Sequence, residues 1–343
     1  MTVRDLLMAT RVVNDPALVA AHNHSPYVTA YPWSGGFGTK VANPASLPNN
    51  AGYSVAFSPD GAFVAVGHSA SPYISVYPWS SSGFGTKVAN PATLPGGEVC
   101  GIAFSPNGAY IALAHVGSPY ISVYPWSSSG FGTKLADPAS VPGYTGYCVA
   151  FRPDGAYLAV GDNSEPVINV YPWSNGFGTR FSDPASPPGS VGYGVAFSPN
   201  GAFIAVAHGS YPYLNVYPWS GSGFGTKVAN PATLPTGQGK AVAFSPDGAY
   251  LALAHEGSPY VSVYPWSSSG FGTKVANPAT LPSGHALGVA FSPDGAYLAV
   301  VNSDTSSPYV YLTVYPWNGA FGSALTPASA LPGTGYAVAW RPQ

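Results

Sequence analysis

The chain has 343 residues, of which 46% are hydrophobic and 14% aromatic, so it has enough apolar surface to fold despite its 42 glycines and 37 prolines. Only 7% of the residues are charged and the formal net charge is -2, which provides no basic surface for nucleic acid or for an anionic membrane. No apolar run approaches the roughly 18 residues of a membrane span, and Arg4 and Asp5 interrupt any signal-peptide core. We therefore expect no nucleic-acid partner, no membrane span, no secretion signal and synthesis in the cytoplasm.

The first thirteen residues match no later segment, whereas the rest of the chain is a tandem repeat. We predict an N-terminal arm at residues 1–13 and a single folded domain at residues 14–343. Two motifs define the repeat: Tyr-Pro-Trp occurs seven times, and a block of the type VAFSPDG also occurs seven times, the last time as VAWRPQ. The tryptophans of the first motif lie 46 to 51 residues apart, at Trp33, Trp79, Trp126, Trp173, Trp219, Trp266 and Trp317.

Each repeat is predicted to form four short strands. In the unit that starts at Val242, the first ends in VAFSPDG, the second is AYLALAH, the third YVSVYPW and the fourth TKVAN. Bulky and small side chains alternate along these strands, as expected when both faces of a sheet are buried. Units of this length with four antiparallel strands, repeated seven times, predict a seven-bladed all-β propeller.

The two ends of the chain indicate how the ring closes. The last segment, from Gly335 to Gln343, matches only the first strand of a unit, while the chain after Asn14 begins at a second strand. We therefore predict that the C-terminal first strand joins the three N-terminal strands in one blade.

The AFSPDG block, the strand that follows it and the aromatic end of the third strand resemble the WD40-like family of seven-bladed propellers. This chain departs from the family in having Pro-Trp where Trp-Asp ends the third strand, so the family's buried polar network is not transferred to it. The near-identical repeats SPYISVYPW and NPATLP also resemble propeller segments of virion-associated proteins of tailed bacteriophages. That second resemblance implies a structural or adhesion component of a virion, with other virion subunits as partners.

Histidine recurs at the end of the second strand in five repeats, which raises the question of a metal site. Neighbouring sheets pack about 10 Å apart, whereas zinc ligands lie about 2.0–2.2 Å from the ion, so equivalent histidines cannot share one metal. We predict instead that each imidazole hydrogen-bonds to a neighbouring strand or turn, and we expect no metal and no cofactor. The five are His22, His68, His115, His208 and His255, with Asp162 and Asn302 in the other two repeats.

A tyrosine follows the Ser-Pro or Tyr-Pro turn before the third strand in six repeats. The resemblance places these turns on one face of the ring, where Tyr, Pro, Asn and Ser form an uncharged recognition surface for a protein partner or a surface glycan. The alternative is that each tyrosine begins the third strand and packs inward. The six candidates are Tyr27, Tyr73, Tyr120, Tyr213, Tyr260 and Tyr309.

A basic residue opens the predicted fourth strand in six repeats, and such residues protect sheet edges against pairing with other chains. The seventh repeat has Ala324 at this position. Ala324 is therefore our candidate for a contact with another subunit.

Catalysis has little support in the sequence, because no Ser-His-Asp, Glu-x-x-His or Cys-His grouping is present and no catalytic residue is assigned. The predicted function is a non-enzymatic binding or assembly module, with a glycan-binding propeller as the first alternative. The second alternative is a lactonase-like enzyme, since propeller lactonases resemble this architecture and place charged residues at the mouth of the channel. The inner-strand positions expected there are Tyr53, Cys100, Tyr147, Tyr193, Lys240, Leu287 and Tyr336, of which only Lys240 ionises near neutral pH.

Overall fold

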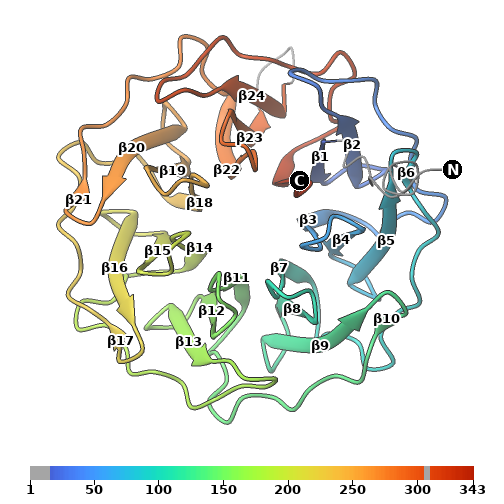
Figure 1. The fold of residues 1–343 in the computed structure, drawn as a ribbon, viewed down its shortest axis with the longest axis horizontal. Helices are drawn as coiled ribbons and strands as arrows, with labels where there is room; N and C mark the ends of the chain where they lie inside the picture. The colour runs from blue at the N-terminus through green and yellow to red at the C-terminus, as the bar shows by residue number, and fades with distance from the viewer. Residues whose placement is uncertain (1–15, 305–309) are drawn as a thin grey trace, which may run out of the picture.

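The computed structural model describes residues 16–304 and 310–343, and it is a closed ring of seven blades (Figure 1). The predicted arm at residues 1–13 lies outside the described residues. We letter the strands of each blade a to d from the channel to the rim and number the blades from the closing one. No helix in the described ranges is long and apolar enough to cross a membrane.

Strand a is the innermost strand of every blade. The seven a strands are β25 (Gly335–Trp340), β3 (Gly52–Phe57), β7 (Val99–Phe104), β11 (Gly146–Phe151), β14 (Gly192–Phe197), β18 (Gly239–Phe244) and β22 (Gly284–Phe291) in blades 1 to 7. The b strands are β1 (Ala17–His22), β4 (Phe63–His68), β8 (Tyr110–His115), β12 (Tyr157–Asp162), β15 (Phe203–His208), β19 (Tyr250–His255) and β23 (Tyr297–Asp304). The c strands are β2 (Val28–Pro32), β5 (Ile74–Ser80), β9 (Ile121–Ser127), β13 (Ile168–Pro172), β16 (Leu214–Ser220), β20 (Val261–Ser267) and β24 (Leu312–Pro316).

The ring closes in blade 1 as the termini predict. The C-terminal strand β25 pairs antiparallel with β1, with Trp340 opposite Leu18 and Val338 opposite Ala20, and β1 pairs with β2. In Figure 1 the C-terminus lies beside β1 on the inner side of the ring. The prediction that both ends of the chain build one blade is confirmed.

The sequence-based position of the fourth strand is wrong. Strand d is a two-residue Gly-Phe segment that pairs with the end of strand c, and TKVAN contributes one backbone hydrogen bond, such as Val275 N to Val263 O at 2.9 Å. The cause is Pro265, which lies within strand c and has no N–H to donate toward the rim. Strand d is present as β6 (Gly83–Phe84), β10 (Gly130–Phe131), β17 (Gly223–Phe224) and β21 (Gly270–Phe271).

Blades 1, 4 and 7 have a shorter c–d loop, and in the described residues their fourth strand is reduced to an isolated bridge, Trp33–Phe37, Trp173–Phe177 or Trp317–Phe321. Three of the seven sheets therefore have three strands, and the other four have the predicted four.

Tyrosine and tryptophan of the Tyr-Pro-Trp motif hold the blades together. The tyrosine is fully buried, and its hydroxyl donates to a carbonyl of the preceding d–a loop, as Tyr124 does to Thr93 O at 2.9 Å. The tryptophan is also buried, and in six of the seven blades it packs edge-to-face on an aromatic residue of the preceding blade, as Trp126 does on Phe63 with ring centroids 5.3 Å apart. These contacts confirm the predicted packing role of the seven tryptophans.

Candidate functional site

The ring has two faces, which we name by the turns that they carry. The turns between strands a and b lie on the a–b face, and the turns between strands b and c lie on the b–c face. The d–a loops also lie on the b–c face, because Asn49 Nδ2 donates to Ser71 O at 2.7 Å and Ser69 N to Ala51 O at 3.0 Å.

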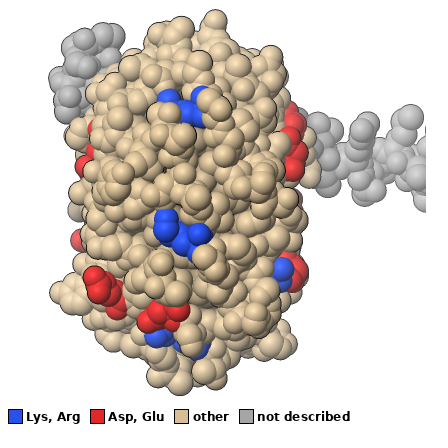
Figure 2. All heavy atoms as spheres, turned by 90° about the vertical axis from the view of Figure 1, so that its left-hand side faces the viewer, with Lys and Arg blue, Asp and Glu red and all other residues tan. Residues whose placement is uncertain are grey.

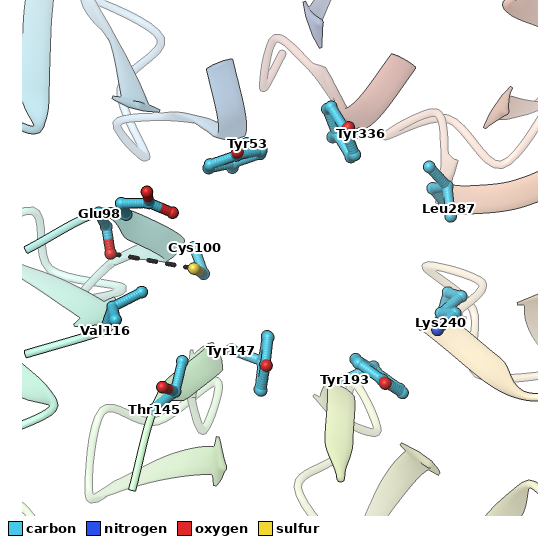
Figure 3. Close-up of a pocket in the computed structure, with 10 residues that line it drawn as sticks. All are labelled: Tyr53, Glu98, Cys100, Val116, Thr145, Tyr147, Tyr193, Lys240, Leu287 and Tyr336. Atoms are coloured by element: carbon cyan, nitrogen blue, oxygen red, sulfur yellow. Dashed lines mark hydrogen bonds between the residues drawn. The ribbon is translucent and has the colours of Figure 1, made fainter. Parts of the chain in front are cut away.

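The channel opens on the b–c face into a cavity of about 430 Å³, which we call the mouth (Figure 3). Val116 and Thr145, from loops of the b–c face, place it at this end of the channel, and a smaller cavity of about 210 Å³ is lined by the a strands. All seven inner-strand positions expected at the channel line the mouth. Its lining is Tyr53, Glu98, Cys100, Val116, Thr145, Tyr147, Tyr193, Lys240, Leu287 and Tyr336.

Four tyrosines dominate the wall of the mouth. Tyr147 and Tyr193 meet edge-to-face with centroids 5.3 Å apart, and Tyr53 and Tyr336 do so at 5.1 Å. Burial raises the pKa of Tyr147 and Tyr336, and burial followed by the nearby Glu98 carboxylate raises the pKa of Tyr53. These three phenols are therefore protonated at neutral pH and can donate hydrogen bonds to a ligand.

Neighbouring side chains compensate the positive charge of Lys240. Its Nζ lies 3.0 Å from Glu256 Oε1 and 2.9 Å from Gln238 Oε1, and it sits 3.7 Å from the centroid of the Tyr193 ring. The ammonium group is therefore held by an ion pair, a hydrogen bond and an aromatic face at once.

Glu98 lies across the mouth from Lys240, beside Tyr53 and Cys100 (Figure 3). Its side chain is half-buried, and no ion pair to it is found among the described residues. Burial, together with the Glu98 charge, raises the pKa of the Cys100 thiol to about 12, so this cysteine is a thiol rather than a nucleophilic thiolate at neutral pH. Glu98 is the carboxylate at the mouth that is free to act on a ligand.

Five of the tyrosines predicted to bind a partner lie in the b–c turns of blades 1, 2, 3, 5 and 6, and they do not line the mouth. Tyr27, Tyr73, Tyr120, Tyr213 and Tyr260 each follow a cis proline, have φ between 68° and 72°, and are half-buried. Tyr73 and Tyr260 pack against buried residues, in line with the inward-packing alternative. Tyr309 lies outside the described residues. Partner binding by this set stays a prediction.

Four of the five histidines at the end of strand b have the predicted structural contact. Four of them lie 2.9–3.1 Å, through Nε2, from a hydroxyl of strand c, as His115 does from Ser122 Oγ. In blade 5 Asn215 replaces the hydroxyl residue and donates to the Tyr217 hydroxyl. Residues 16–304 and 310–343 contain no group of three or more side chains suited to a metal ion.

Ala324, the predicted subunit contact, lies at the rim of blade 7. It is half-buried against the cluster that includes Trp317, and the next residue, Leu325, pairs with Val314 through two backbone hydrogen bonds. In blades 3 and 4 the equivalent basic residues, Lys134 and Arg180, pair with Asp137 and Asp183. Figure 2 shows how widely such charges are separated on the side of the ring in view.

Replacing Ala324 with Lys tests the subunit contact. A charge at a buried interface costs several kcal/mol, so we expect Ala324→Lys to shift any oligomer toward the monomer. Light scattering of the wild type and the variant at equal concentration measures this. An unchanged molecular mass in an oligomeric sample would contradict the prediction.

No family model matches the sequence, and neither does any curated protein. Solved structures match over nearly their whole length. A Bacteroides uniformis protein provisionally named 6-phosphogluconolactonase has a TM-score of 0.73 at 18% identity, covering 95% of this chain and 99% of its own. The periplasmic gluconolactonase of Pseudomonas aeruginosa has a TM-score of 0.71 at 18% identity, with the same coverage of 95% and 99%.

A Desulfotomaculum acetoxidans protein of unknown function is similar as well, with a TM-score of 0.70 at 14% identity, covering 95% of this chain and 99% of its own. At these identities the matches establish the seven-bladed fold and no more. None of the three names is that of a virion protein, so the phage resemblance gains no support from them.

Proposed function

We propose that this protein is a binding propeller that holds a small, uncharged, ring-shaped compound rich in hydroxyl groups, such as a sugar or a sugar lactone, in the mouth. The observation that carries the proposal is the convergence of four tyrosines on one cavity of about 430 Å³, a size in the range of small-molecule sites. Tyrosine rings offer flat apolar faces to the C–H groups of such a ring, while their hydroxyls bond its oxygens.

The electrostatics of the mouth favour a neutral ligand over a phosphorylated one. The Lys240 ammonium is paired with Glu256, and Glu98 adds a negative charge on the opposite side. A phosphate group in the mouth would have to compete with Glu256 for Lys240 and would meet the Glu98 carboxylate. We therefore expect sugar phosphates to bind more weakly than the parent sugars.

Titration calorimetry with 1,5-anhydroglucitol, an uncharged ring without a reactive carbonyl, tests the binding function. Loss of an aromatic contact is worth roughly 0.5–1.5 kcal/mol, so we expect Tyr147→Ala to weaken binding up to about tenfold. Tyr73→Asn is the matched control on the same face, since asparagine tolerates the positive φ of this position.

Glucose and glucose 6-phosphate, titrated in parallel, test the preference for a neutral ligand. Equal affinity of the wild type and Tyr147→Ala for every ring that binds would contradict a site in the mouth. A loss confined to Tyr73→Asn would move the site to the tyrosines of the b–c turns.

A second candidate function, lactone hydrolysis, is favoured by the unpaired carboxylate of Glu98 at the mouth. A carboxylate in this place can take a proton from a water that attacks the lactone carbonyl, and the protonated tyrosines can donate hydrogen bonds to the oxyanion that forms. The ring C–O bond then breaks, and the released alkoxide takes up the proton. The similarity in fold to proteins named as lactonases supports this candidate by analogy alone.

Ring opening of glucono-1,5-lactone, followed at constant pH against the spontaneous rate, separates the two candidates. A lactonase loses at least a hundredfold in turnover on Glu98→Gln, since general-base catalysis contributes roughly 10²–10⁴. A binding protein gives the spontaneous rate in the wild type and the variant alike. We do not propose a virion role, because none of the similar proteins described above is named as a virion protein.

A further inference from the structure

The a–b face, opposite the mouth, carries grooves between neighbouring blades. One groove, of about 450 Å³, lies between blades 2 and 3, and another, of about 340 Å³, lies between blades 6 and 7. The two grooves are built from equivalent residues of the repeat. Ser58, Asp60, Phe63 and Trp126 line the first, and Ser245, Asp247, Tyr250 and Trp317 line the second.

Each groove has carboxylate oxygens at its rim that can accept further hydrogen bonds. In the a–b turn, Asp60 Oδ1 accepts from Ser58 Oγ at 2.5 Å and from Ala62 N at 3.0 Å, whereas no described residue donates to its Oδ2. Asp60 is exposed, so this second oxygen can accept from a ligand hydroxyl. In the second groove both rims carry a carboxylate, Asp247 and Asp294.

The floor of each groove is aromatic. The half-buried ring of Phe63 meets Trp126 edge-to-face at 5.3 Å in the first groove, and Tyr250 meets Trp317 in the same way at 5.2 Å in the second. An aromatic floor below carboxylate and hydroxyl groups suits a sugar ring, which has C–H groups on its faces and hydroxyls at its edge.

At two other blade junctions the same space is filled by the chain itself. Arginine replaces the first serine of the turn in blades 4 and 1, where Arg152 Nε donates to Gly201 O at 2.9 Å and Arg341 Nε to Gly61 O at 3.0 Å. A Cβ built on Gly201 would lie 2.4 Å from Arg152 Nε, whereas one built on Gly108, at the first groove, meets nothing closer than Pro59 Cδ at 3.9 Å. The repeat therefore has an open form with serine and a filled form with arginine.

We propose that the open grooves bind sugar residues of an uncharged polysaccharide, one residue in each groove, so that the ring holds the polymer at both grooves. This goes beyond the ligand of the mouth, because the grooves lie on the opposite face and take a polymer rather than a single small ring. A polyanionic glycan is disfavoured by the carboxylates at the rims. Simultaneous engagement raises the apparent affinity well above that of one groove.

The filled form of the repeat supplies the test. The double variant Ser58→Arg and Ser245→Arg places arginine where Arg152 and Arg341 already fit, so the fold is kept while the two grooves are filled. Affinity electrophoresis in gels that contain dextran, mannan or galactan measures binding. We expect at least one polysaccharide to retard the wild type, and the double variant to lose at least tenfold in apparent affinity.

A second variant keeps the test valid if the arginines disturb the fold. Asp60→Asn with Asp247→Asn preserves the turns, since asparagine occupies this position at Asn107 and Asn200, and we expect it to weaken retardation at least threefold. Arg152→Ser opens a further groove and should strengthen retardation at least twofold. Thermal melting confirms that each variant is folded.

Three results would overturn the proposal: no retardation by any of the three polysaccharides, retardation that a folded Ser58→Arg and Ser245→Arg variant leaves unchanged, or retardation lost only in Tyr147→Ala. The last result would assign polysaccharide binding to the mouth. We expect the double variant Ser58→Arg and Ser245→Arg to bind 1,5-anhydroglucitol as the wild type does. This result would show that the mouth and the grooves bind their ligands independently.

Discussion

Deletion of Gly335–Gln343 is expected to lower the melting temperature by at least 10 °C or to prevent folding. The deletion removes β25, the innermost strand of blade 1, together with the buried side chains Val338 and Trp340. Trp340 packs edge-to-face on Trp33 at 4.9 Å and donates through Nε1 to Ala290 O at 3.1 Å, so it joins blade 1 to blade 7. Truncation of a buried tryptophan alone costs about 3–5 kcal/mol, and the loss of the β25–β1 pairing adds to this.

A shorter deletion and a peptide serve as controls for this prediction. Removal of Pro342 and Gln343 leaves β25 complete, and we expect it to change the melting temperature by less than 2 °C. A synthetic peptide of residues 335–343, added to the truncated chain, should restore part of the lost stability by occupying the vacant inner position. A truncated chain that melts with the wild type would show that closure contributes nothing to stability.

Acid is expected to unfold the protein between pH 6.5 and pH 4. The five histidines at the end of strand b have no exposed surface, and burial lowers the pKa of each from 6.5 to about 4. Because the folded pKa is below the unfolded one, their contribution to stability is complete above pH 6.5 and is lost as the pH falls toward 4. Each shift corresponds to roughly 3 kcal/mol, so five together are comparable with the whole stability of a typical domain.

Urea unfolding at pH 7.5 and pH 5.0 measures this effect. His115→Asn is the matched variant, since Asn302 holds the equivalent position in blade 7, and it removes one of the five groups that take up a proton on unfolding. We expect the wild type to lose several kcal/mol between the two pH values and His115→Asn to lose less. Burial raises the pKa of Asp162, which acts in the opposite direction and offsets a small part of the loss. A free energy of unfolding that is constant over this range would refute the prediction.

The architecture could be predicted from the sequence because the same strand pattern recurs seven times. Alternating large and small residues indicate strands a, b and c. The incomplete repeat units at the two ends of the chain, after Asn14 and before Gln343, predict the closure, which the pairing of β25 with β1 confirms. The sequence predicts strand d at TKVAN because this segment has an ordinary strand composition. In the structure the proline of Tyr-Pro-Trp has no N–H to pair with it, and strand d is the Gly-Phe segment instead.

The mouth was predictable in part. Its seven inner-strand residues follow from their register in strand a, but Glu98 and Thr145 come from d–a loops whose course the repeat does not specify. The available signal was that Glu98 and Glu256 are two of the three glutamates in the chain. The ion pair between Lys240 and Glu256 joins strand a to a b–c turn, and only the folded ring brings the two together.

The grooves could not be foreseen, because each one is formed by two successive repeats. Within one repeat, the serine at the start of the a–b turn and its arginine replacement look like interchangeable turn residues. Their difference lies in the neighbouring blade, where Arg152 reaches Gly201 and Ser58 leaves the space beside Gly108 open.

A crystal structure of the protein soaked with 1,5-anhydroglucitol tests the central claim, that the mouth is a site for a neutral polyhydroxylated ring. We predict the ligand on the b–c face, within hydrogen-bonding distance, about 3.2 Å or less, of the hydroxyl of Tyr53, Tyr147 or Tyr193. An empty mouth at a ligand concentration that saturates binding in solution would contradict the account.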